Sequence, residues 1–187
     1  MIIQGNDPFT GPSFNLSHRI RRQLWSWVWF VFFLPSPRPF HFWRNLLLRM
    51  FGAKLGWHVH IYPSVKVWAP WNLTVGSYVG IGDGTNVYCM DQITIGDYAV
   101  ISQGSHLCAG SHDFNSANFQ LITAPITIGS RVWLCADSFV GPGVHIADGS
   151  VIGARAVVSK SITEPWCVWA GVPVKRVGSR DKEKVLA

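Results

Sequence analysis

An aliphatic residue returns every six positions through the second half of the chain, and this period constrains the fold more than any other feature. Within residues 126–163 it falls on Ile128, Leu134, Val140, Ile146, Ile152 and Val158. The residue after each is small: Gly129, Cys135, Gly141, Ala147, Gly153 and Ser159. A helix repeats its apolar positions about every 3.6 residues and a strand about every 2, so a period of six fits neither alone. It predicts a parallel β-helix, in which short strands form the flat faces of each coil and point one aliphatic side chain inward.

The period continues upstream, with interruptions at regular intervals. The aliphatic positions there are Ile61, Val67, Val75, Ile81, Val87, Ile95, Ile101 and Leu107. Two steps, 67–75 and 87–95, are eight residues long, which predicts a two-residue insertion once per coil at the same corner. The step 107–128 spans 21 residues, so one face carries about fifteen extra residues. A long insertion without its own periodicity is either functional or disordered, and its sequence, CAGSHDFNSANFQLITAP, favours a functional loop.

An aromatic, apolar helix is predicted over residues 18–34, with Ser17 as its N-cap. Its apolar run, 24–34, reaches roughly 16 Å at about 1.5 Å per residue, about half of a hydrocarbon core of about 30 Å. It is therefore too short to span a membrane. Three tryptophans that follow three arginines resemble an interfacial anchor, which predicts peripheral contact of residues 18–34 with a membrane. The alternative is a helix packed in a subunit interface or against the coil.

The prolines of residues 35–39 end this helix, and a second, amphipathic helix follows. Its apolar positions are Trp43, Leu46, Leu47, Met50 and Phe51, with Arg44, Asn45 and Arg49 on the opposite face. We expect the apolar face to cover the open N-terminal end of the coil, and Gly52 to be the C′ residue. The predicted domains are an N-terminal arm with two helices (1–56), a β-helix (57–163) with a catalytic loop (108–127), and a closing segment with a tail (164–187).

Charge and cysteine usage narrow the partners and the compartment. The net charge of +6 and the pI of about 9.4 favour anionic partners, such as phosphorylated ligands or an acidic membrane surface. Nucleic acid is disfavoured, because the repeats carry few basic residues and no nucleic-acid-binding motif. The cysteines, Cys89, Cys108, Cys135 and Cys167, form no CxxC pair, so we expect packed free thiols. With no visible signal peptide, this predicts a cytoplasmic protein, peripheral at the inner face of the membrane if residues 18–34 bind lipid.

Four segments resemble the hexapeptide-repeat acyltransferases: CAGSHD (108–113), IGSRVWLCADSFVGPGV (128–144), IGARAVVSK (152–160) and WAGVPVKRV (169–177). The resemblance is closest to the maltose, galactoside and nodulation O-acetyltransferases and to the acetyltransferases of colanic acid and exopolysaccharide biosynthesis. The latter share the proline-rich segment and second helix of residues 35–56. The family implies a mainly β fold, a left-handed parallel β-helix, in a homotrimer. It also implies transfer of an acetyl group from acetyl-CoA to a sugar hydroxyl, with no metal required.

The resemblance also assigns catalytic and acceptor-binding residues. The family's general base is a histidine at the start of the inserted loop, and His112, the only histidine of the long insertion, occupies that place. Histidine suits this task because its ordinary pKa of about 6.5 leaves much of it neutral and able to take the hydroxyl proton. Asp113 is a candidate to orient the imidazole. Asn86 and Asp91 stand near the family's acceptor-binding pair, although the spacing differs, and Trp133 matches a tryptophan beside the loop that would form a wall of the site.

In this family CoA lies along the C-terminal coils, mostly against backbone groups beside small side chains. The matching positions here are Ala136, Ala154 and the Ser159–Lys160 pair, and Lys175 and Arg176 are further basic residues of the closing segment. The three basic residues are candidates to bind the nucleotide phosphates. A further basic residue of the galactoside enzymes is Gly178 here, for which Arg180 or Arg176 could substitute. Because family sites lie between subunits, we expect His112 of one subunit to meet CoA on the next.

The first interpretation is an acetyl-CoA-dependent O-acetyltransferase in the biosynthesis of exopolysaccharide, capsule or lipopolysaccharide. Its acceptor would be a sugar or a lipid-linked saccharide. One alternative is a γ-type carbonic anhydrase, which needs three histidines on zinc; His106, His112 and His145 are available but lack that family's spacing. The other is a non-catalytic trimeric scaffold. Within the first interpretation, a different donor such as succinyl-CoA stays open.

Overall fold

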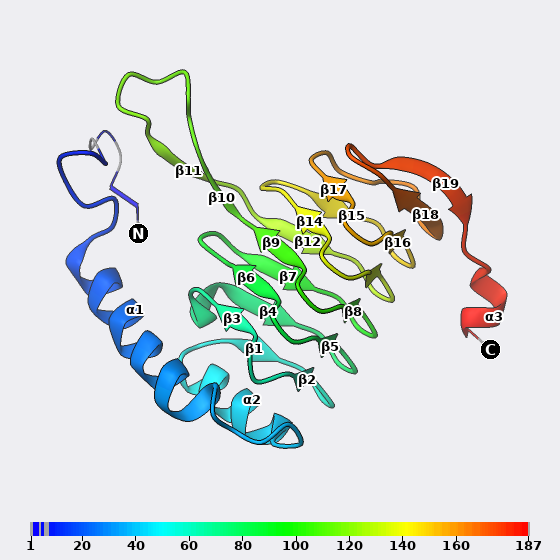
Figure 1. Cartoon of the computed structure of the whole chain (residues 1–187), viewed down its shortest axis with the longest axis horizontal. Helices are drawn as coiled ribbons and strands as arrows, with labels where there is room; N and C mark the ends of the chain where they lie inside the picture. Colours follow the sequence, from blue (N-terminus) through cyan, green and yellow to red (C-terminus); the bar gives the residue numbers. More distant parts are fainter. Residues whose placement is uncertain (1, 4, 6–7, 187) are drawn as a thin grey trace.

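The centre of the molecule is a three-sided parallel β-helix (Figure 1). This computed structural model describes residues 2–3, 5 and 8–186. Successive coils contribute one short strand each to three sheets, and the strands of neighbouring coils pair in parallel, as β6 and β9 do through Val87 and Leu107. The predicted parallel β-helix with N-terminal helices and one long inserted loop is confirmed.

Each sheet gathers one side of the coil. The first contains β1 (Lys54–Leu55), β4 (Leu73–Val75), β7 (Ile93–Ile95), β12 (Ile126–Ile128) and β15 (His145–Ile146). The second contains β2 (His60–Ile61), β5 (Gly80–Ile81), β8 (Val100–Ile101), β13 (Trp133–Leu134), β16 (Val151–Ile152), β18 (Cys167–Ala170) and β19 (Lys175–Ser179). The third contains β3 (Lys66–Val67), β6 (Asn86–Tyr88), β9 (His106–Cys108), β14 (Phe139–Val140) and β17 (Val157–Val158).

The six-residue period fills the interior of the coil. Its aliphatic side chains between residues 128 and 158 are at most 1% exposed, and the residues four places after them are at most 3% exposed. Between the strands, the chain turns through residues with positive φ, such as Arg131 (58°), Asp137 (59°) and Arg155 (57°). One inward aliphatic per face and one left-handed residue per corner therefore explain why the period is six.

Insertions accumulate at the corner between the third and first sheets, as the spacing predicted. In the first coil a 3-10 turn, η2 (Pro70–Asn72), occupies this corner, and in the second coil residues 89–92 do. The third coil carries the long insertion, which forms an antiparallel hairpin of β10 (Gly110–His112) and β11 (Leu121–Thr123). The hairpin projects away from the coil beside the N-terminal arm (Figure 1).

The first helix, α1 (Leu16–Val28), runs directly into a π-helical segment, η1 (Trp29–Phe33). One face packs on the coil, where the indole N–H groups of Trp25 and Trp29 donate to the carbonyls of Val67 and Val65 at 2.6 and 2.8 Å. The predicted cap was wrong. Asn15 caps the helix by accepting from the His18 N–H at 3.0 Å, and Ser17 lies in the first turn. Among the described residues, no helix combines the length and apolarity needed to cross a membrane.

The second helix, α2 (His41–Met50), closes the open end of the coil, but its buried face matches the predicted one only in part. Leu47 is buried as predicted. Arg44 and Asn45 are buried, whereas Leu46 and Met50 are 46% and 71% exposed. The reason is that the first coil has no coil beneath it, so its carbonyls need donors. Arg44 Nε donates to Ile61 O at 2.6 Å. Its guanidinium also donates to Ser36 Oγ and to the carbonyls of Pro37 and Arg38.

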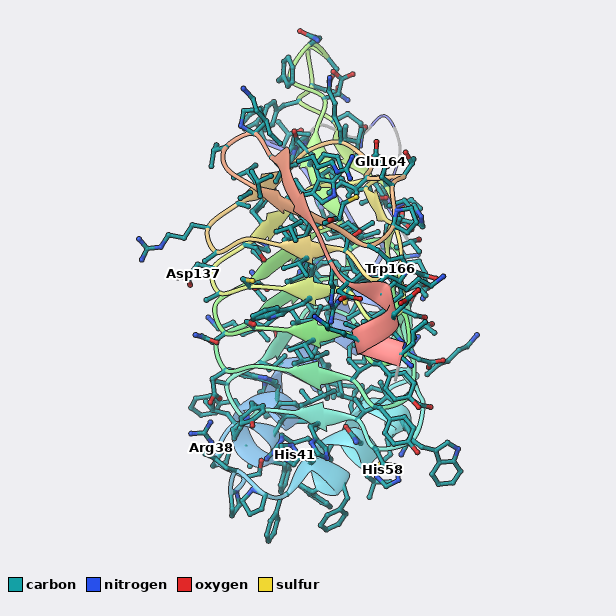
Figure 2. All side chains as sticks on the ribbon, turned by 90° about the vertical axis from the view of Figure 1, so that its right-hand side faces the viewer. Arg38, His41, His58, Asp137, Glu164 and Trp166 are labelled. Carbon is teal, nitrogen blue, oxygen red and sulfur yellow. The ribbon has the colours of Figure 1, made fainter. Side chains whose placement is uncertain are left out.

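At the opposite end of the coil the chain reverses, and its last residues run back beside the coil (Figure 1). β18 and β19 form an antiparallel pair, and a short helix, α3 (Lys182–Leu186), follows. Figure 2 views the molecule from the side of β18, β19 and α3. Arg38 and His41 lie at the end of the coil that α2 caps, and Glu164 lies toward the C-terminal end of the coil. Gly52, with a φ of 97°, follows α2 as its C′ residue, as predicted.

Candidate active site

His112 lies on β10, at the start of the hairpin, with its imidazole fixed by the opposite side of the loop. Its Nδ1 is 2.9 Å from the carbonyl oxygen of Phe119, and the two rings stack at 4.4 Å. A carbonyl can only accept, so Nδ1 carries the proton and donates, and in the neutral imidazole the free lone pair is therefore on Nε2. Phe119 has a φ of 46°, an uncommon conformation for a bulky residue, and this aims its carbonyl at the imidazole.

Asp113 does not orient the imidazole. Its Oδ1 accepts from the backbone N–H of Asn115 at 3.0 Å, and its own N–H donates to Gln120 O at 2.8 Å. Asp113 therefore shapes the turn of the hairpin, while Phe119 O holds His112.

A groove of about 600 Å³ lies at the base of the hairpin, and Asp91 lines it. Its other lining residues are Ile2, Phe14, His18, Trp71, Asn72, Met90 and Thr123. Thr123 pairs with Gly110 across the hairpin, and Met90 packs so closely on Gly110 that a side chain there would clash. His112 is two strand residues beyond Gly110, about 7 Å along the strand. Asp91 and His112 thus lie at the same end of the hairpin.

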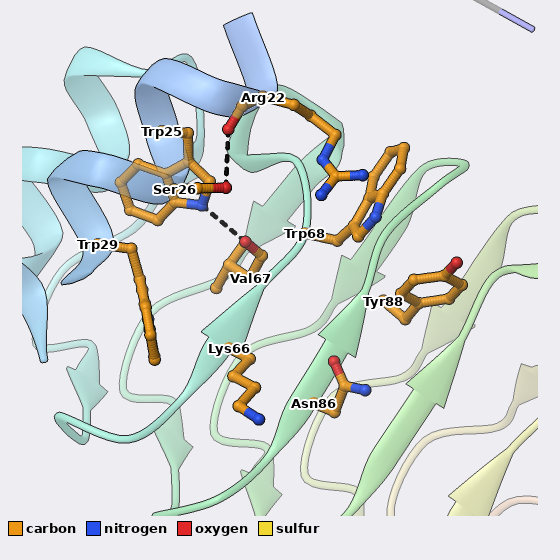
Figure 3. Close-up of a pocket in the computed structure, with 9 residues that line it drawn as sticks. All are labelled: Arg22, Trp25, Ser26, Trp29, Lys66, Val67, Trp68, Asn86 and Tyr88. Atoms are coloured by element: carbon orange, nitrogen blue, oxygen red, sulfur yellow. Dashed lines mark hydrogen bonds between the residues drawn. The ribbon is translucent and has the colours of Figure 1, made fainter. Parts of the chain in front are cut away.

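Asn86 lines a different pocket, of about 310 Å³, between α1 and the third sheet (Figure 3). The other residues around it are Arg22, Trp25, Ser26, Trp29, Lys66, Val67, Trp68 and Tyr88. Asn86 Nδ2 is 3.3 Å from Nε2 of His106. His106 is six residues before His112, up to about 20 Å along an extended chain. Asn86 therefore lines a different pocket from the groove at the base of the hairpin that carries His112.

Several pocket-lining residues were missed by the sequence reasoning. His18 stacks on Phe14 at 4.6 Å and lies 5.3 Å from the Trp68 ring. Burial, helped by the charges of Arg22 and Arg21, lowers the pKa of His18 to about 4, so it is neutral near pH 7. The signal that could have found this cluster is the four-residue spacing of His18 and Arg22 on one helix face.

Trp133 lies on the second sheet, away from the hairpin of its own chain. It is half exposed, and its indole N–H donates to Ser102 Oγ at 2.9 Å. It lines a small hollow together with Tyr98, Val100, Arg131, Val132 and Arg180. Because the hairpin leaves the corner between the third and first sheets, Trp133 and His112 do not share a pocket within one chain.

The predicted CoA-binding residues occupy two corners of the C-terminal coils. Ala136 and Ala154 stack at one corner, where the N–H of Arg155 donates to Ala136 O at 2.9 Å. Lys175, exposed on β19, pairs with Ala170 close to the same corner. Arg176 Nη1 lies 3.3 Å from Glu164 Oε2. Ser159 and Lys160 are exposed at the corner after β17.

Arg180 is held by the coil. Its Nη1 donates to the carbonyls of Arg131 and Gly149, at 2.6 and 3.2 Å. Both candidates for the family's missing basic residue are therefore engaged within the chain, Arg180 by backbone carbonyls and Arg176 by Glu164.

The histidines of the carbonic anhydrase interpretation are dispersed: His106 lies on β9, His145 on β15, and His112 on the hairpin. Within the part of the chain that the structure describes, no three histidine, cysteine or acidic side chains are arranged to hold a metal ion. The cysteines are free, as expected, and burial raises the pKa of the Cys89 thiol to about 12.

Comparison with known proteins agrees with the coil and its inserted hairpin. The model of the bacterial transferase hexapeptide family (six repeats) matches residues 125–160. Over 149 residues the chain is 50% identical to the "Putative colanic acid biosynthesis acetyltransferase WcaF" of Escherichia coli (strain K12), a match that covers 80% of this chain and 82% of that protein. The chain therefore belongs to the hexapeptide-repeat acetyltransferases.

Two solved structures have the same fold. One is a maltose O-acetyltransferase from Clostridium difficile 630, with a TM-score of 0.82 over 90% of both chains and 21% identity. The other is a hexapeptide-repeat acetyltransferase from Vibrio cholerae O1 biovar eltor, complexed with acetyl coenzyme A. Its TM-score is 0.81 at 22% identity, over 90% of this chain and 91% of that one.

Proposed function

We propose that this acetyltransferase transfers the acetyl group of acetyl-CoA to a saccharide hydroxyl in the biosynthesis of a surface polysaccharide. The observation that carries the proposal is the hydrogen bond between His112 Nδ1–H and Phe119 O, because it selects the neutral tautomer whose lone pair is on Nε2, the form in which His112 can act as a base. The name of the Escherichia coli relative supports the polysaccharide context.

In the proposed reaction, His112 Nε2 takes the proton of the acceptor hydroxyl as its oxygen attacks the thioester carbonyl. The tetrahedral intermediate collapses as the C–S bond breaks, and the imidazolium returns the proton to the CoA sulfur. Before the proton transfer, the hydrogen bond from Nδ1–H to the Phe119 carbonyl holds the neutral tautomer that the first step requires. After the transfer, the same bond stabilises the imidazolium.

We assign the acceptor to the grooves lined by Asp91 and Asn86, whose side chains would hydrogen-bond its hydroxyls. The donor would lie on the C-terminal coils at Ala136, Ala154 and Ser159, with Lys160, Lys175 and Arg176 toward its phosphates. A homotrimer would complete this site. Trp133 lies on a different sheet from the hairpin, so a neighbouring copy is needed to bring it to His112.

We also propose that the N-terminal helices attach this enzyme to an anionic membrane surface, on the cytoplasmic side. Exposed apolar side chains form outward stripes on the helices, each 46–71% exposed: Ile20, Leu24, Trp27, Phe30 and Val31 on the first, and Phe42, Leu46 and Met50 on the second. A cleft of about 350 Å³ at residues 31–43 joins the two stripes. Eight basic residues and no acidic residue lie between positions 8 and 82, so the charge is complementary to anionic headgroups.

The proposed function is tested by CoA release from acetyl-CoA with a panel of oligosaccharides and sugar phosphates. We expect release that depends on the acceptor. If the protein neither binds CoA nor releases it with any acceptor, the scaffold alternative is favoured. Hydration of CO₂ that requires zinc would instead favour the carbonic anhydrase alternative.

A further inference from the structure

We propose that Arg22 and Lys66 bind a phosphoryl group of the acceptor, so that the enzyme acts on a saccharide linked through a phosphate or diphosphate. This inference rests on the proposed function and specifies its substrate class. It is carried by the pocket between α1 and the third sheet (Figure 3), in which these two side chains are the cations.

The charge of Arg22 is only partly solvated and is not neutralised by the protein. Its guanidinium stacks over the Trp68 ring at 4.3 Å, and its Nε is buried without a hydrogen-bond partner among the described residues. Burial lowers the pKa of Arg22. Within the described part of the chain, no carboxylate forms an ion pair with Arg22 or Lys66. A partly buried cation without a counter-ion is costly, and a bound anion would remove that cost.

The rest of the pocket is rigid and aromatic. The indole N–H groups of Trp25 and Trp29 are bonded to backbone carbonyls of the first coil, which fixes two of its walls. Trp68 and Tyr88 complete the aromatic lining. Preformed pockets with apolar walls and a few charged groups are typical of small-molecule sites. An arginine fixed on an aromatic ring presents its N–H groups to a phosphate in a defined geometry.

The position of the pocket suits one end of an acceptor whose saccharide lies in the Asp91 groove. His18 lines the Asp91 groove and Arg22 lines this pocket, one helical turn apart, which is about 6 Å along α1. The Trp68 ring contacts both side chains and lies between the two cavities. An acceptor with its sugar at Asp91 therefore has its phosphoryl group within reach of Arg22. The hairpin that carries His112 lies on the other side of the Asp91 groove from Arg22.

The test is equilibrium binding to the full chain, without acetyl-CoA, by isothermal titration calorimetry. The probes are inorganic pyrophosphate, a nucleoside diphosphate hexose, a farnesyl diphosphate hexose and the free hexose. Arg22→Gln and Lys66→Gln are compared with Arg19→Gln, one turn earlier on the same helix, and Lys54→Gln, an exposed lysine in the same coil. Melting temperatures of all variants confirm that each is folded.

We expect the diphosphate probes to bind, and Arg22→Gln to weaken binding about tenfold or more, with a smaller loss for Lys66→Gln. The two controls should bind within about twofold of the wild type, and binding should weaken with added salt. The tighter of the two glycosylated probes identifies a nucleotide or a lipid as the carrier.

Equal affinity of the wild type and Arg22→Gln for every diphosphate probe would overturn the inference. So would turnover of neutral oligosaccharides by a protein that binds no diphosphate; in that case the proposed acetyl transfer stands and only the phosphoryl site is lost. Diphosphate binding that depends on Arg22, without acetyl transfer to any acceptor, would reject the proposed function and leave the phosphoryl site in place.

Discussion

A single buried arginine closes the N-terminal end of the coil. Arg44 is 0% exposed and donates to three carbonyls and one hydroxyl, which lie at the open end of the first coil and in the turn before α2. Burial lowers the pKa of Arg44, but arginine remains protonated because its ordinary pKa is far above neutral. Arg44 therefore supplies hydrogen-bond donors to carbonyls at the end of the coil, where there is no further coil strand to pair with them.

Replacing this arginine by an apolar residue of similar length should therefore be costly. We expect Arg44→Met to lower the free energy of unfolding by at least about 3 kcal/mol, since each buried acceptor left without a donor costs about 1–3 kcal/mol. Arg49→Met is the matched control: Arg49 also donates to backbone carbonyls, but is exposed, so its loss should cost less than about 1 kcal/mol. Urea denaturation measures both, and equal losses would contradict this account of Arg44.

The neutral state of His18 predicts how stability responds to acid. Its pKa is about 4 in the folded protein and about 6.5 when unfolded, so between these values the unfolded chain binds more protons. This part of the stability is fully present above about pH 6.5 and is lost as the pH falls toward about 4. The melting temperature of His18→Gln should fall less than that of the wild type between about pH 7 and pH 4.5. Identical falls would show that His18 does not contribute.

At the proposed active site, the sequence could single out the candidate histidine but not the group that orients it. His112 is found by the motif GSHD and by its place in an aperiodic insertion. The orienting group is a backbone carbonyl, Phe119 O, brought back by the hairpin, and no residue type marks such a group. Asp113 looked plausible by type, but it is committed to the turn.

Among the elements, the coil strands were predictable and the helix orientations were not. The six-residue period predicts which side chains point inward, because every coil repeats the same contacts. On α2, the apolar stripe predicted burial of Leu46 and Met50, but the unpaired carbonyls of the coil end select Arg44 and Asn45. Burial of these polar residues leaves Leu46 and Met50 exposed, and they form part of the stripe of the proposed membrane contact.

Removing side chains from the two stripes should reduce lipid binding. In flotation with vesicles containing anionic phospholipid, we expect the double variant Phe30→Ser/Phe42→Ser to partition at least about tenfold more weakly. Burial of one large apolar side chain contributes about 1.5–3 kcal/mol, and about 1.4 kcal/mol is a factor of ten. Phe114→Ser, which removes a 79% exposed phenylalanine from the hairpin, is the control and should float as the wild type does. Flotation of the double variant at the wild-type level would exclude these stripes as the contact.

For the whole molecule, the placement of the site residues on different sides of the coil predicts shared active sites. His112 lies on the hairpin, whereas Ala154 lies at the corner between the second and third sheets. If neighbouring copies supply the two halves, two inactive variants should complement each other. Co-expressed His112→Ala and Ala154→Trp chains should recover part of the CoA release that each lacks alone. No recovery in a mixed trimer of normal mass would mean that each chain carries a complete site.

The measurement that tests the account most directly is CoA release by the wild type, His112→Ala and His145→Ala with a saccharide acceptor. His145 is an exposed histidine on the first sheet, outside the proposed site, and serves as the matched control. The account predicts a fall of about 10²–10⁴-fold for His112→Ala, as expected for loss of a general base, and no change for His145→Ala. Turnover by His112→Ala within a few-fold of the wild type would contradict the account and remove His112 from the mechanism.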